Sequence, residues 1–390
     1  MRPNIDAPNT AKKSVLVTEG AQKNTLGIVR SLAQEGNKVH VVVSSKWDTC
    51  KFSKFTSGFL YLDRLSVKCI LGYIQKNSID SIIPVGIIST QFFSDHRDSF
   101  SKVELVIPTR KQLKIACSKQ LTYDKAIDCE IPIPETYYPQ DIEEIEVLAG
   151  EIPYPCVIKW LYEVGANIVD YAFNKQDLLK KYRKLCELHE YDETTGLPMI
   201  QEYIEGDGVG EFALYYKGEK ISSYQHKRLR EAPPSGGSST AAITISNENL
   251  SILAHKILKR LDWNGVAMVE FKEKPNGDLV LMEINAKFWG SYDLGHAAGL
   301  NFPANLIRLG AGEYVKPAGK YIIGKKYYWP LDGDLRHATV SLRRFCDVLG
   351  CIVDPRVKSN LWLVTDPKPA VMKLIVTLAV SIRNAFRSLR

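Results

Sequence analysis

Several patterns are absent from this sequence, and each absence argues against a class of protein. The eight cysteines include no Cys-x-x-Cys pair, which argues against a structural zinc site. Residues 18–24, which follow the first strand-like run, contain no Gly-x-Gly-x-x-Gly, so a dinucleotide site there has little support. No apolar run approaches the roughly 18 residues that a membrane-spanning helix needs. We also find no internal repeat and no low-complexity tract.

A strong excess of charge is also missing. The net charge of +7 suits anionic ligands or an acidic membrane surface, but it is too small on its own to indicate nucleic acid. We find no basic patch interleaved with aromatic residues, so we expect no nucleic-acid partner. The N-terminus, MRPNIDAPNTAKKS, does not resemble a signal peptide. We therefore expect a cytoplasmic protein whose cysteines are free thiols.

The chain itself is long enough for two or three domains, with 390 residues of which 45% are hydrophobic. Strand-like and helix-like runs alternate over about the first 110 residues, at 14–18, 19–35, 39–44, 65–77 and 81–86. Such alternation is typical of an open parallel sheet with crossover helices. We predict an α/β class, α+β overall, with an N-terminal open parallel α/β domain at residues 1–113.

The pattern changes after residue 113. Two strand-rich pieces, 155–160 and 197–208, bracket a lysine-rich helix at about 175–188. Residues 211–229 are predicted to form a hairpin that turns at Lys217-Gly218, and a helix at about 246–260 follows a loop at 230–240. This order predicts a second, mixed α+β domain.

A second hairpin, in residues 266–290, places two glutamates against each other. With Asn276-Gly277 as a two-residue turn, counting outward pairs Glu270 with Glu283 and places Asn285 on the same face. The opposite face carries core residues, namely Val269, Phe271, Val280, Met282 and Ile284. Like charges directly opposed destabilise a sheet, and Mg²⁺ bound by these oxygens would offset that cost. The alternative is a solvated hairpin relieved by Lys272.

Four further motifs carry residues suited to binding anions or nucleotides. They are CSKQLTYDKA at 117–126, PCVIKW at 155–160, QEYI at 201–204, and QHKRLR at 225–230, which PPSGGSS follows after Glu231 and Ala232. Together with the hairpin, their order and spacing resemble the ATP-grasp enzymes of the carbamoyl-phosphate-synthase-like branch over residues 114–312. The resemblance implies an ATP-grasp domain at 114–318 with a lid subdomain at about 155–204. A C-terminal extension, 319–390, remains.

The resemblance also assigns roles to residues. Lys119 and Lys159 match the two lysines that neutralise the phosphates of ATP, with Lys125 as the alternative to Lys119. Gln201, Glu202, Tyr203 and Ile204 match the segment whose free strand edge meets adenine. Glu211 matches a ribose-binding carboxylate, although Glu205 and Asp207 lie close by. Glu270, Glu283 and Asn285 match the metal ligands.

Three basic residues are the implied catalytic groups. Arg228 and Arg230 would hold the transferring phosphoryl or acyl group with bidentate bonds, and Lys159 would act beside them. His226 in the same motif is as readily structural. Two positions depart from the branch: Asn285-Ala286-Lys287 replaces Asn-Pro-Arg, and the loop after Lys159 contains one glycine, Gly165. The N-terminal domain carries no acceptor motif that we can identify.

These features predict an ATP-dependent carboxylate-amine ligase that forms an acyl phosphate and releases ADP and phosphate. The alternatives are a phosphotransferase on the same scaffold and a non-catalytic ATP-binding scaffold. We expect ATP and Mg²⁺ as cofactors, with Mn²⁺ as a substitute, and small-molecule carboxylate and amine substrates. A homodimer would be common for such folds. The basic amphipathic helix at 370–390 would contact either protein or an anionic membrane surface, and the latter would make the protein peripheral.

Overall fold

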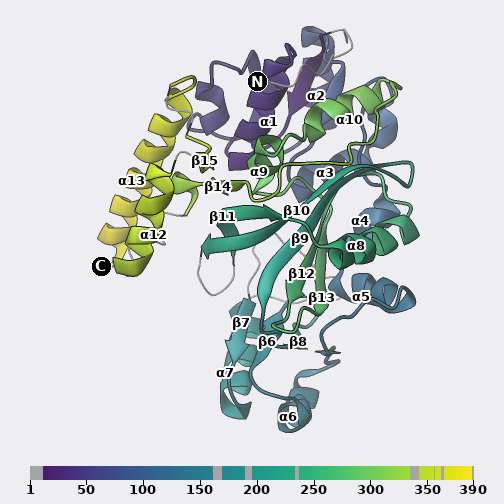
Figure 1. Ribbon diagram of the computed structural model, residues 1–390, viewed down its shortest axis with the longest axis vertical. Coiled ribbons are helices and arrows are strands. Elements are labelled where there is room, and N and C mark those ends of the chain that lie inside the picture. Colours follow the sequence, from purple (N-terminus) through teal and green to yellow (C-terminus); the bar gives the residue numbers. More distant parts are fainter. Residues whose placement is uncertain are drawn as a thin grey trace.

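The computed structural model describes residues 12–160, 169–188, 196–232, 237–333, 342–354, 356–361 and 364–388. Figure 1 shows three layers along the long axis: the N-terminal α/β part at the top, a large sheet in the middle, and a small sheet with two helices below. The C-terminal helices lie along one side. The predicted fold class is confirmed.

The N-terminal part is a four-stranded parallel sheet in the order β3-β2-β1-β4. Its core lies on both faces, because Val15 and Val17 pack on one side while Leu16 packs on the other. The strands are β1 (Ser14–Val17), β2 (Lys38–Val43), β3 (Gly58–Tyr61) and β4 (Ser81–Ile83). The helices are α1 (Lys23–Gln34), α2 (Val67–Asn77), α3 (Ile87–Asp95) and α4 (Arg110–Cys117), with short 3₁₀ turns η1 (Thr49–Phe52) and η2 (Arg97–Phe100). The sequence analysis did not predict β3.

The large sheet has seven strands in the order β13-β12-β9-β10-β11-β14-β15. They are β9 (Asp207–Tyr216), β10 (Glu219–Ala232), β11 (Ser238–Ile245), β12 (Gly265–Glu273), β13 (Leu279–Asn285), β14 (Lys326–Tyr328) and β15 (Lys358–Ser359). The predicted turn between β9 and β10 is confirmed, and Lys217 and Gly218 both adopt positive φ there. The accompanying helices are α5 (Lys119–Asp128), α8 (Glu248–Arg260), α9 (Tyr292–Ala297) and α10 (Phe302–Gly310).

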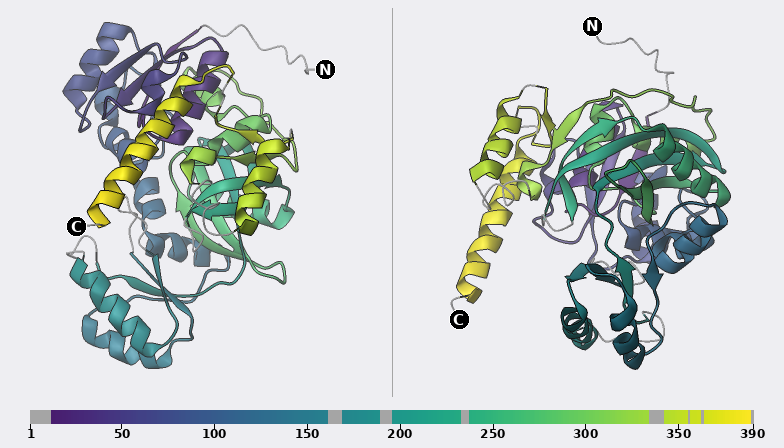
Figure 2. Two further views of the ribbon diagram at one scale, coloured as in Figure 1. Left: turned by 90° about the vertical axis from the view of Figure 1, so that its left-hand side faces the viewer. Right: turned by 60° about the horizontal axis from the view of Figure 1, so that its bottom comes forward.

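The small sheet is antiparallel, in the order β5-β8-β6-β7. Its strands are β5 (Thr136–Tyr137), β6 (Cys156–Lys159), β7 (Val169–Ala172) and β8 (Met199–Glu202), and α6 (Ile142–Glu151) and α7 (Lys175–Leu188) carry its other core residues. The lysine-rich helix is therefore where the sequence predicted it. Figure 2 shows this part projecting from the rest of the molecule. Gly165 lies outside the described residues.

The C-terminal part both completes the large sheet and adds helices. Residues 326–328 and 358–359 form β14 and β15, so the predicted 319–390 segment supplies two strands of that sheet. The 3₁₀ turn η3 (Pro330–Asp332), α12 (Leu342–Val353) and α13 (Lys368–Ser388) make up the remainder. In the part of the chain that is described, no helix has the length and apolar character needed to cross a membrane. None of the eight cysteines, each within the described ranges, forms a disulfide bond.

Candidate active site

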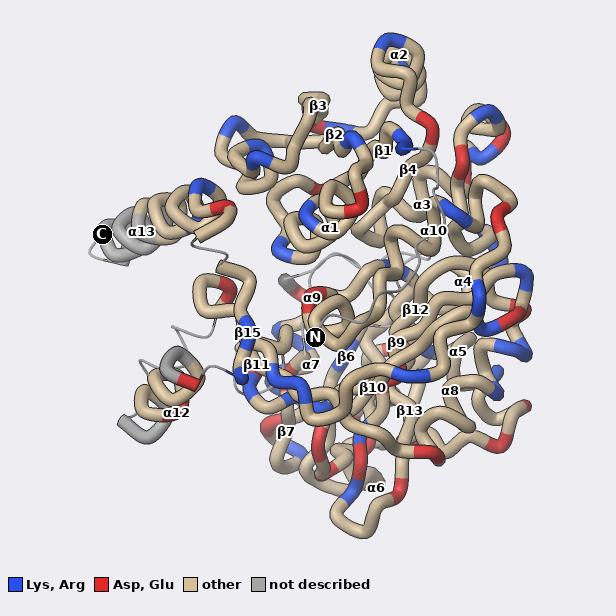
Figure 3. Tube along the Cα trace, turned by 45° about the horizontal axis from the view of Figure 1, so that its top comes forward, with Lys and Arg blue, Asp and Glu red and all other residues tan. Residues whose placement is uncertain are grey.

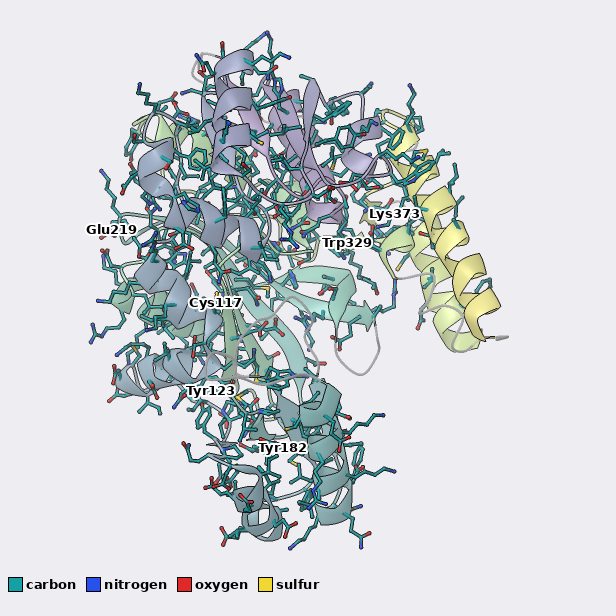
Figure 4. The ribbon with its side chains drawn as sticks, turned by 180° about the vertical axis from the view of Figure 1, so that it is seen from behind. Cys117, Tyr123, Tyr182, Glu219, Trp329 and Lys373 are labelled. Carbon is teal, nitrogen blue, oxygen red and sulfur yellow. The ribbon has the colours of Figure 1, made fainter. Side chains whose placement is uncertain are left out.

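Charged side chains from four elements meet between the large sheet and the small one. They come from the hairpin β12-β13, from β10, from the start of α5 and from the end of β6: Glu270, Glu283, Asn285, Arg228, Lys119 and Lys159. Figure 4 places Tyr123 at this junction, above the part formed by the small sheet and helix α7, which carries Tyr182. The structure thus brings together six of the predicted site residues.

The register of the large sheet explains why the glutamates face the same way. Glu270 pairs with Glu283 on β13 and with Gly210 on β9, and Gly210 in turn pairs with His226 on β10. Directly paired residues project to the same face of a sheet. The predicted opposition of Glu270 and Glu283, with Asn285 beside Met268, is therefore confirmed.

The turn that produces this register differs from the predicted one. Lys274 donates its backbone N–H to the Asp278 carbonyl at 2.8 Å, so the loop has three residues, and Gly277 closes it with φ of +89°. Near the turn the pairing is therefore shifted by one residue, to Phe271 with Leu281. A bulge at Met282 removes the shift before Glu283 is reached.

The bulge also corrects the predicted core face. Leu279, Leu281 and Ile284 lie in the core cluster on that face, together with Val269 and Phe271. Met282, which we predicted there, is only partly buried. Leu281 and Met282 are consecutive apolar residues, so the alternation pattern could not indicate that a bulge lies there.

The opposed carboxylates are compensated by basic side chains of the protein. Arg228 Nη2 lies 2.6 Å from Glu270 Oε2, and Lys119 Nζ lies 3.8 Å from Glu283 Oε2. Asn285 Nδ2 donates to Glu283 Oε1 at 2.7 Å. Basic side chains therefore offset part of the opposed charge, and the metal site remains a prediction. Lys272 does not relieve the pair, because its Nζ donates to the Gly206 carbonyl at 2.8 Å.

The two carboxyl groups differ in proton affinity. Burial raises the pKa of Glu270, although Arg228 opposes the shift. The pKa of Glu283 is lowered, because Lys119, the Asn285 amide and Lys159 together outweigh its burial. Lys287 adds to this lowering, so the residue that replaces the branch's arginine still contributes positive charge near the pair. Glu283 is therefore the more firmly ionised of the two.

Lys119 reaches the pair because it opens helix α5. Ser118 caps that helix by accepting from the Leu121 N–H at 3.3 Å, which directs the first turn toward β13. The alternative, Lys125, lies further along α5 and pairs with Asp128 at 2.7 Å on the surface. The geometry favours Lys119 over Lys125.

Lys159 approaches the same pair from the small sheet. Its Nζ donates to Gln201 Oε1 at 2.8 Å. Burial and the neighbouring Lys119 lower the pKa of Lys159 to about 8, although Glu283 and Glu270 oppose the shift. Two ammonium groups, one from helix α5 and one from strand β6, therefore converge on the glutamates, as a polyanionic ligand would require.

The predicted adenine segment lies only partly at a free edge. β8 is an interior strand between β5 and β6, and the Glu202 N–H donates to the Glu135 carbonyl at 2.8 Å. Gln201 and Glu202 are thus paired on both sides, whereas Tyr203 and Ile204, whose backbone groups would meet adenine, lie beyond the end of β8, and the adenine contact remains a prediction. Gln201 is fully buried, and Glu202 Oε2 accepts from the Glu135 N–H at 3.2 Å.

Glu211 does not join the cluster. It pairs with Gln225 on β10 and with Val269 on β12, one residue along from Gly210, so its side chain projects to the opposite face from Glu270. It is 3% exposed, and burial raises its pKa. The structure therefore separates the predicted ribose ligand from the other site residues.

The basic motif on β10 divides between two environments. Arg228 points to the glutamates, whereas Arg230 donates to Cys351 Sγ of α12 at 3.3 Å and 3.4 Å. His226 is 2% exposed, and its Nε2 lies 2.7 Å from Ser291 Oγ. Burial and Arg228 lower the pKa of His226 to about 3, so it is neutral and supports the loop after β13. Residues 233–236 of the same motif lie outside the described residues.

Comparison with curated proteins finds similarity over part of the chain. The large chain of carbamoyl phosphate synthase from Saccharolobus solfataricus is 22% identical over 254 residues, which cover 63% of this chain and 23% of that protein. Formate-dependent phosphoribosylglycinamide formyltransferase from Sulfurisphaera tokodaii is 22% identical over 201 residues, 48% of each chain. This chain therefore spans from about a quarter to about half of the length of these relatives. No protein-family model matches it.

Comparison with solved structures covers more of the chain. Biotin carboxylase from Campylobacter jejuni, in a complex with a β,γ-ATP, superposes with a TM-score of 0.68 at 16% identity, over 81% of this chain and 74% of that one. The biotin carboxylase domain dimer of 2-oxoglutarate carboxylase from Hydrogenobacter thermophilus, in complex with magnesium ADP, ADP and bicarbonate, gives 0.64 at 17% identity over 79% and 72%. L-amino acid ligase from Bacillus licheniformis gives 0.60 at 14% identity over 79% and 78%.

The chain has the ATP-grasp fold. The charged cluster lies between two sheets of this fold, and the lid subdomain that the sequence motifs implied at about 155–204 remains a prediction.

The ATP-grasp cluster suits a hard divalent cation. It offers two carboxylates and one amide oxygen, and Mg²⁺ takes one or two protein carboxylates while keeping positions for substrate phosphates. Among the described residues, no three or more His, Cys, Asp or Glu side chains form a metal-binding group. The residues therefore fit a metal that is held jointly with a phosphorylated ligand.

The sequence analysis missed residues that shape this ATP-grasp site. Gly208 and Gly210 lie on the same face of β9 as the glutamates, and a Cβ at Gly208 would meet Arg228 Cδ at 3.1 Å. Tyr123 donates its hydroxyl to the Met282 carbonyl, at the bulge, at 2.9 Å. Glycines at alternate strand positions were a usable signal, since they leave one face of the strand open. No local pattern pointed to Tyr123.

Proposed function

We propose that this chain is an ATP-dependent ligase that activates a carboxylate as an acyl phosphate and joins it to an amine. The support is one arrangement: Lys119 of helix α5 and Lys159 of strand β6 converge on the opposed Glu270 and Glu283 in an ATP-grasp fold. Its structural neighbours include biotin carboxylase and an L-amino acid ligase, which agrees with the proposal.

In the first step a carboxylate oxygen of the substrate attacks the γ-phosphorus of ATP. The bond between the γ-phosphorus and the β,γ-bridging oxygen breaks, which gives an acyl phosphate and ADP. Lys119 and Lys159 would neutralise the phosphate oxygens as charge shifts to the leaving group. Glu270, Glu283 and Asn285 would hold Mg²⁺, or Mn²⁺ in its place, and the bound ion would neutralise phosphate charge.

In the second step the amine nitrogen attacks the acyl carbon, loses a proton, and displaces inorganic phosphate by cleavage of the C–O bond. Arg228 lies 2.6 Å from Glu270, so binding of the cation at that carboxylate would free its guanidinium for the acyl phosphate. Arg230 is the second candidate for this contact. The protein forms no covalent intermediate in this scheme.

The remaining nucleotide contacts are also proposals. Tyr203 and Ile204, which extend beyond β8, would present their backbone groups to adenine, with Gln201 and Glu202 holding that segment. For the ribose, Glu205, which precedes β9, is the better candidate, because Asp207 and Glu211 both project to the face of the sheet opposite Glu270, and Asp207 pairs there with Lys227 at 2.5 Å.

The organisation and setting of the protein extend the proposal. We infer an N-terminal α/β domain at 1–113, an ATP-grasp domain at 114–318 and a C-terminal extension at 319–390. The substrates would be small molecules, the protein cytoplasmic, and the assembly a homodimer.

The test is a screen for ATP consumption in which carboxylates and amines are supplied singly and in pairs. We expect ADP and free phosphate to appear only when a matching carboxylate and amine are both present. A stable phosphorylated product from one substrate would instead indicate a phosphotransferase. Tight ATP binding without turnover across the panel would indicate a binding scaffold, and either result would overturn the ligase.

A further inference from the structure

One surface of the N-terminal part combines exposed aromatic rings with lysines. Trp47, Phe59 and Tyr61 are 51%, 40% and 45% exposed. Lys51 of η1 lies over the rings of both Phe59 and Tyr61, at 5.0 and 5.1 Å from their centroids. Lys46 lies over Trp47 in the same way. Our expectation that the sequence has no basic patch interleaved with aromatic residues is therefore wrong for residues 46–61.

Helix α13 presents an apolar face next to this surface. Val371, Leu374 and Ile375 are 52%, 44% and 48% exposed, and their spacing of three and four residues places them on one face of the helix. Residues 367–390 contain five basic residues and no acidic one: Lys368, Lys373, Arg383, Arg387 and Arg390. Figure 3 shows α13 at the side of the molecule on which blue segments of the N-terminal part also lie.

A buried ion pair fixes the two surfaces to each other. Asp366, two residues before α13, accepts from Arg30 Nε at 2.9 Å, from Ser53 Oγ at 2.7 Å and from the Lys54 N–H at 3.1 Å. Both charged side chains are 2% exposed. Ser53 and Lys54 lie between η1 and β3. Asp366, two residues before α13, is therefore hydrogen-bonded directly to the segment 46–61 that carries the exposed rings and lysines.

We propose that residues 46–61 and α13 together form a surface that docks on an anionic phospholipid bilayer. Aliphatic side chains would enter the boundary between headgroups and acyl chains, Trp47 and Tyr61 would lie at the headgroup level, and the lysines would face lipid phosphates. This inference goes beyond the proposed function and does not depend on it.

The charge and the side-chain types favour a bilayer over other partners. A second copy of the chain would bring two positively charged surfaces together in a symmetric contact, which repels. A single-stranded nucleic acid would use the aromatic rings for stacking, but it has no use for Val371, Leu374 and Ile375. An anionic bilayer accommodates all three kinds of side chain.

The test is co-sedimentation of the full chain, without nucleotide, with vesicles of phosphatidylcholine alone or mixed with phosphatidylglycerol. We expect binding to the mixed vesicles only, weakening as salt is raised. Two double variants, Leu374→Asp with Ile375→Asp and Trp47→Ala with Tyr61→Ala, should each reduce the partition coefficient by about tenfold or more. The matched controls Ile127→Asp and Ile252→Asp alter exposed isoleucines of α5 and α8, on the far side in Figure 1, and should bind as the wild type does.

Four results would overturn the proposal. One is equal binding to both kinds of vesicle or to neither. Another is wild-type binding by either double variant, which would show that the two surfaces do not act together. The third is loss of a dimer in the variants. The fourth is tighter binding of a single-stranded oligonucleotide than of vesicles by the wild type. Circular dichroism of each variant distinguishes lost binding from lost folding.

Discussion

The Tyr123 hydroxyl accepts a hydrogen bond from Gln201 Nε2 at 2.9 Å and donates one to the Met282 carbonyl at 2.9 Å. Gln201 also accepts from Lys159 Nζ. A continuous chain of hydrogen bonds therefore connects the bulge beside Glu283 to the lysine of the other sheet. The side chains of Gln201 and Tyr123 act as positioning groups for Lys159 and do not themselves reach the carboxylates.

Replacement of Gln201 should show how much the fixed position of Lys159 contributes to ATP binding, apart from its positive charge. Gln201→Leu leaves Lys159 Nζ and the Tyr123 hydroxyl without this partner inside the protein, which costs about 1–3 kcal/mol. We expect the KM for ATP to rise by about tenfold while kcat changes less, since Lys159 remains charged but loses its fixed position. Steady-state kinetics with varied ATP measures this, and Gln201→Glu should recover most of the loss. The surface variant Tyr137→Phe, whose hydroxyl bonds only Glu135 in the described contacts, serves as the control.

Replacement of Glu283 tests the metal assignment. Glu283→Gln keeps the shape of the side chain but removes the more firmly ionised carboxylate of the pair. We expect turnover to fall by about 100-fold or more, with an unchanged melting temperature. Calorimetric titration with MgATP should show the same weakening. Glu219→Gln, an exposed glutamate on β10, is the matched control, and wild-type turnover in Glu283→Gln would remove the assignment.

The lowered pKa of Lys159 predicts a pH dependence. Above pH 8 the ammonium loses its proton, so the KM for ATP should rise between pH 8 and 9.5. Lys159→Arg, whose guanidinium stays charged, should flatten that rise. For stability the sign is opposite: the unfolded chain keeps the proton up to about pH 10.4, so this group makes the fold more stable as pH rises from 8 toward that value. A KM that is flat to pH 9.5 in the wild type would contradict the assignment.

Replacement of Glu211 tests which carboxylate binds the ribose. Because its carboxyl projects away from Glu270, Glu211→Gln should change the KM for ATP by less than about twofold. Asp207→Asn should behave in the same way, because Asp207 projects to the same face of β9 as Glu211, whereas Glu205→Gln should have the larger effect if Glu205 binds the ribose. ATP-dependent kinetics of the three variants decides between them, and a large rise for Glu211→Gln alone would restore the ribose role predicted from the sequence.

The buried pair of Arg30 and Asp366 should contribute strongly to stability. Asp366→Asn leaves the guanidinium buried without its counter-ion, which costs about 3–5 kcal/mol. Chemical denaturation measures the loss, and hydrogen exchange should show α13 losing protection first. The double variant Arg30→Met with Asp366→Leu should recover much of it. Asp95→Asn, which breaks an exposed pair with Arg110, should leave the denaturation midpoint unchanged.

The sequence was most informative where structure is local. Alternation with a period of two residues, together with Asn276-Gly277, placed Glu270 opposite Glu283, and the Lys217-Gly218 turn followed from the same reasoning. The bulge could not be predicted, because Leu281 and Met282 are both apolar and either fits the pattern. The predicted pairing of Glu270 with Glu283 is correct because the longer turn shifts the register by one residue and the bulge at Met282 shifts it back.

Contacts between distant segments were not predictable in the same way. The bond between Lys159 and Gln201, and the pairing of Arg228 with Glu270, join residues about 40 positions apart, and only the packing of sheets brings them together. The resemblance to ATP-grasp enzymes supplied the identities of these residues but not their partners. Glu211 shows the limit of motif position alone, since one step along a strand reverses the face of the sheet.

Helix α1 connects the loop that follows β13 to the segment just before α13. Near its start Asn24 Nδ2 donates to the Phe288 carbonyl at 3.2 Å, three residues after Asn285, and one and a half turns later Arg30 holds Asp366. A stretch of α1 about 10 Å long therefore extends from the loop that follows Asn285 to Asp366, two residues before α13. Because Asn24 and Arg30 belong to one helix, a displacement of Asp366 would be transmitted in part through α1 to the loop that follows Asn285.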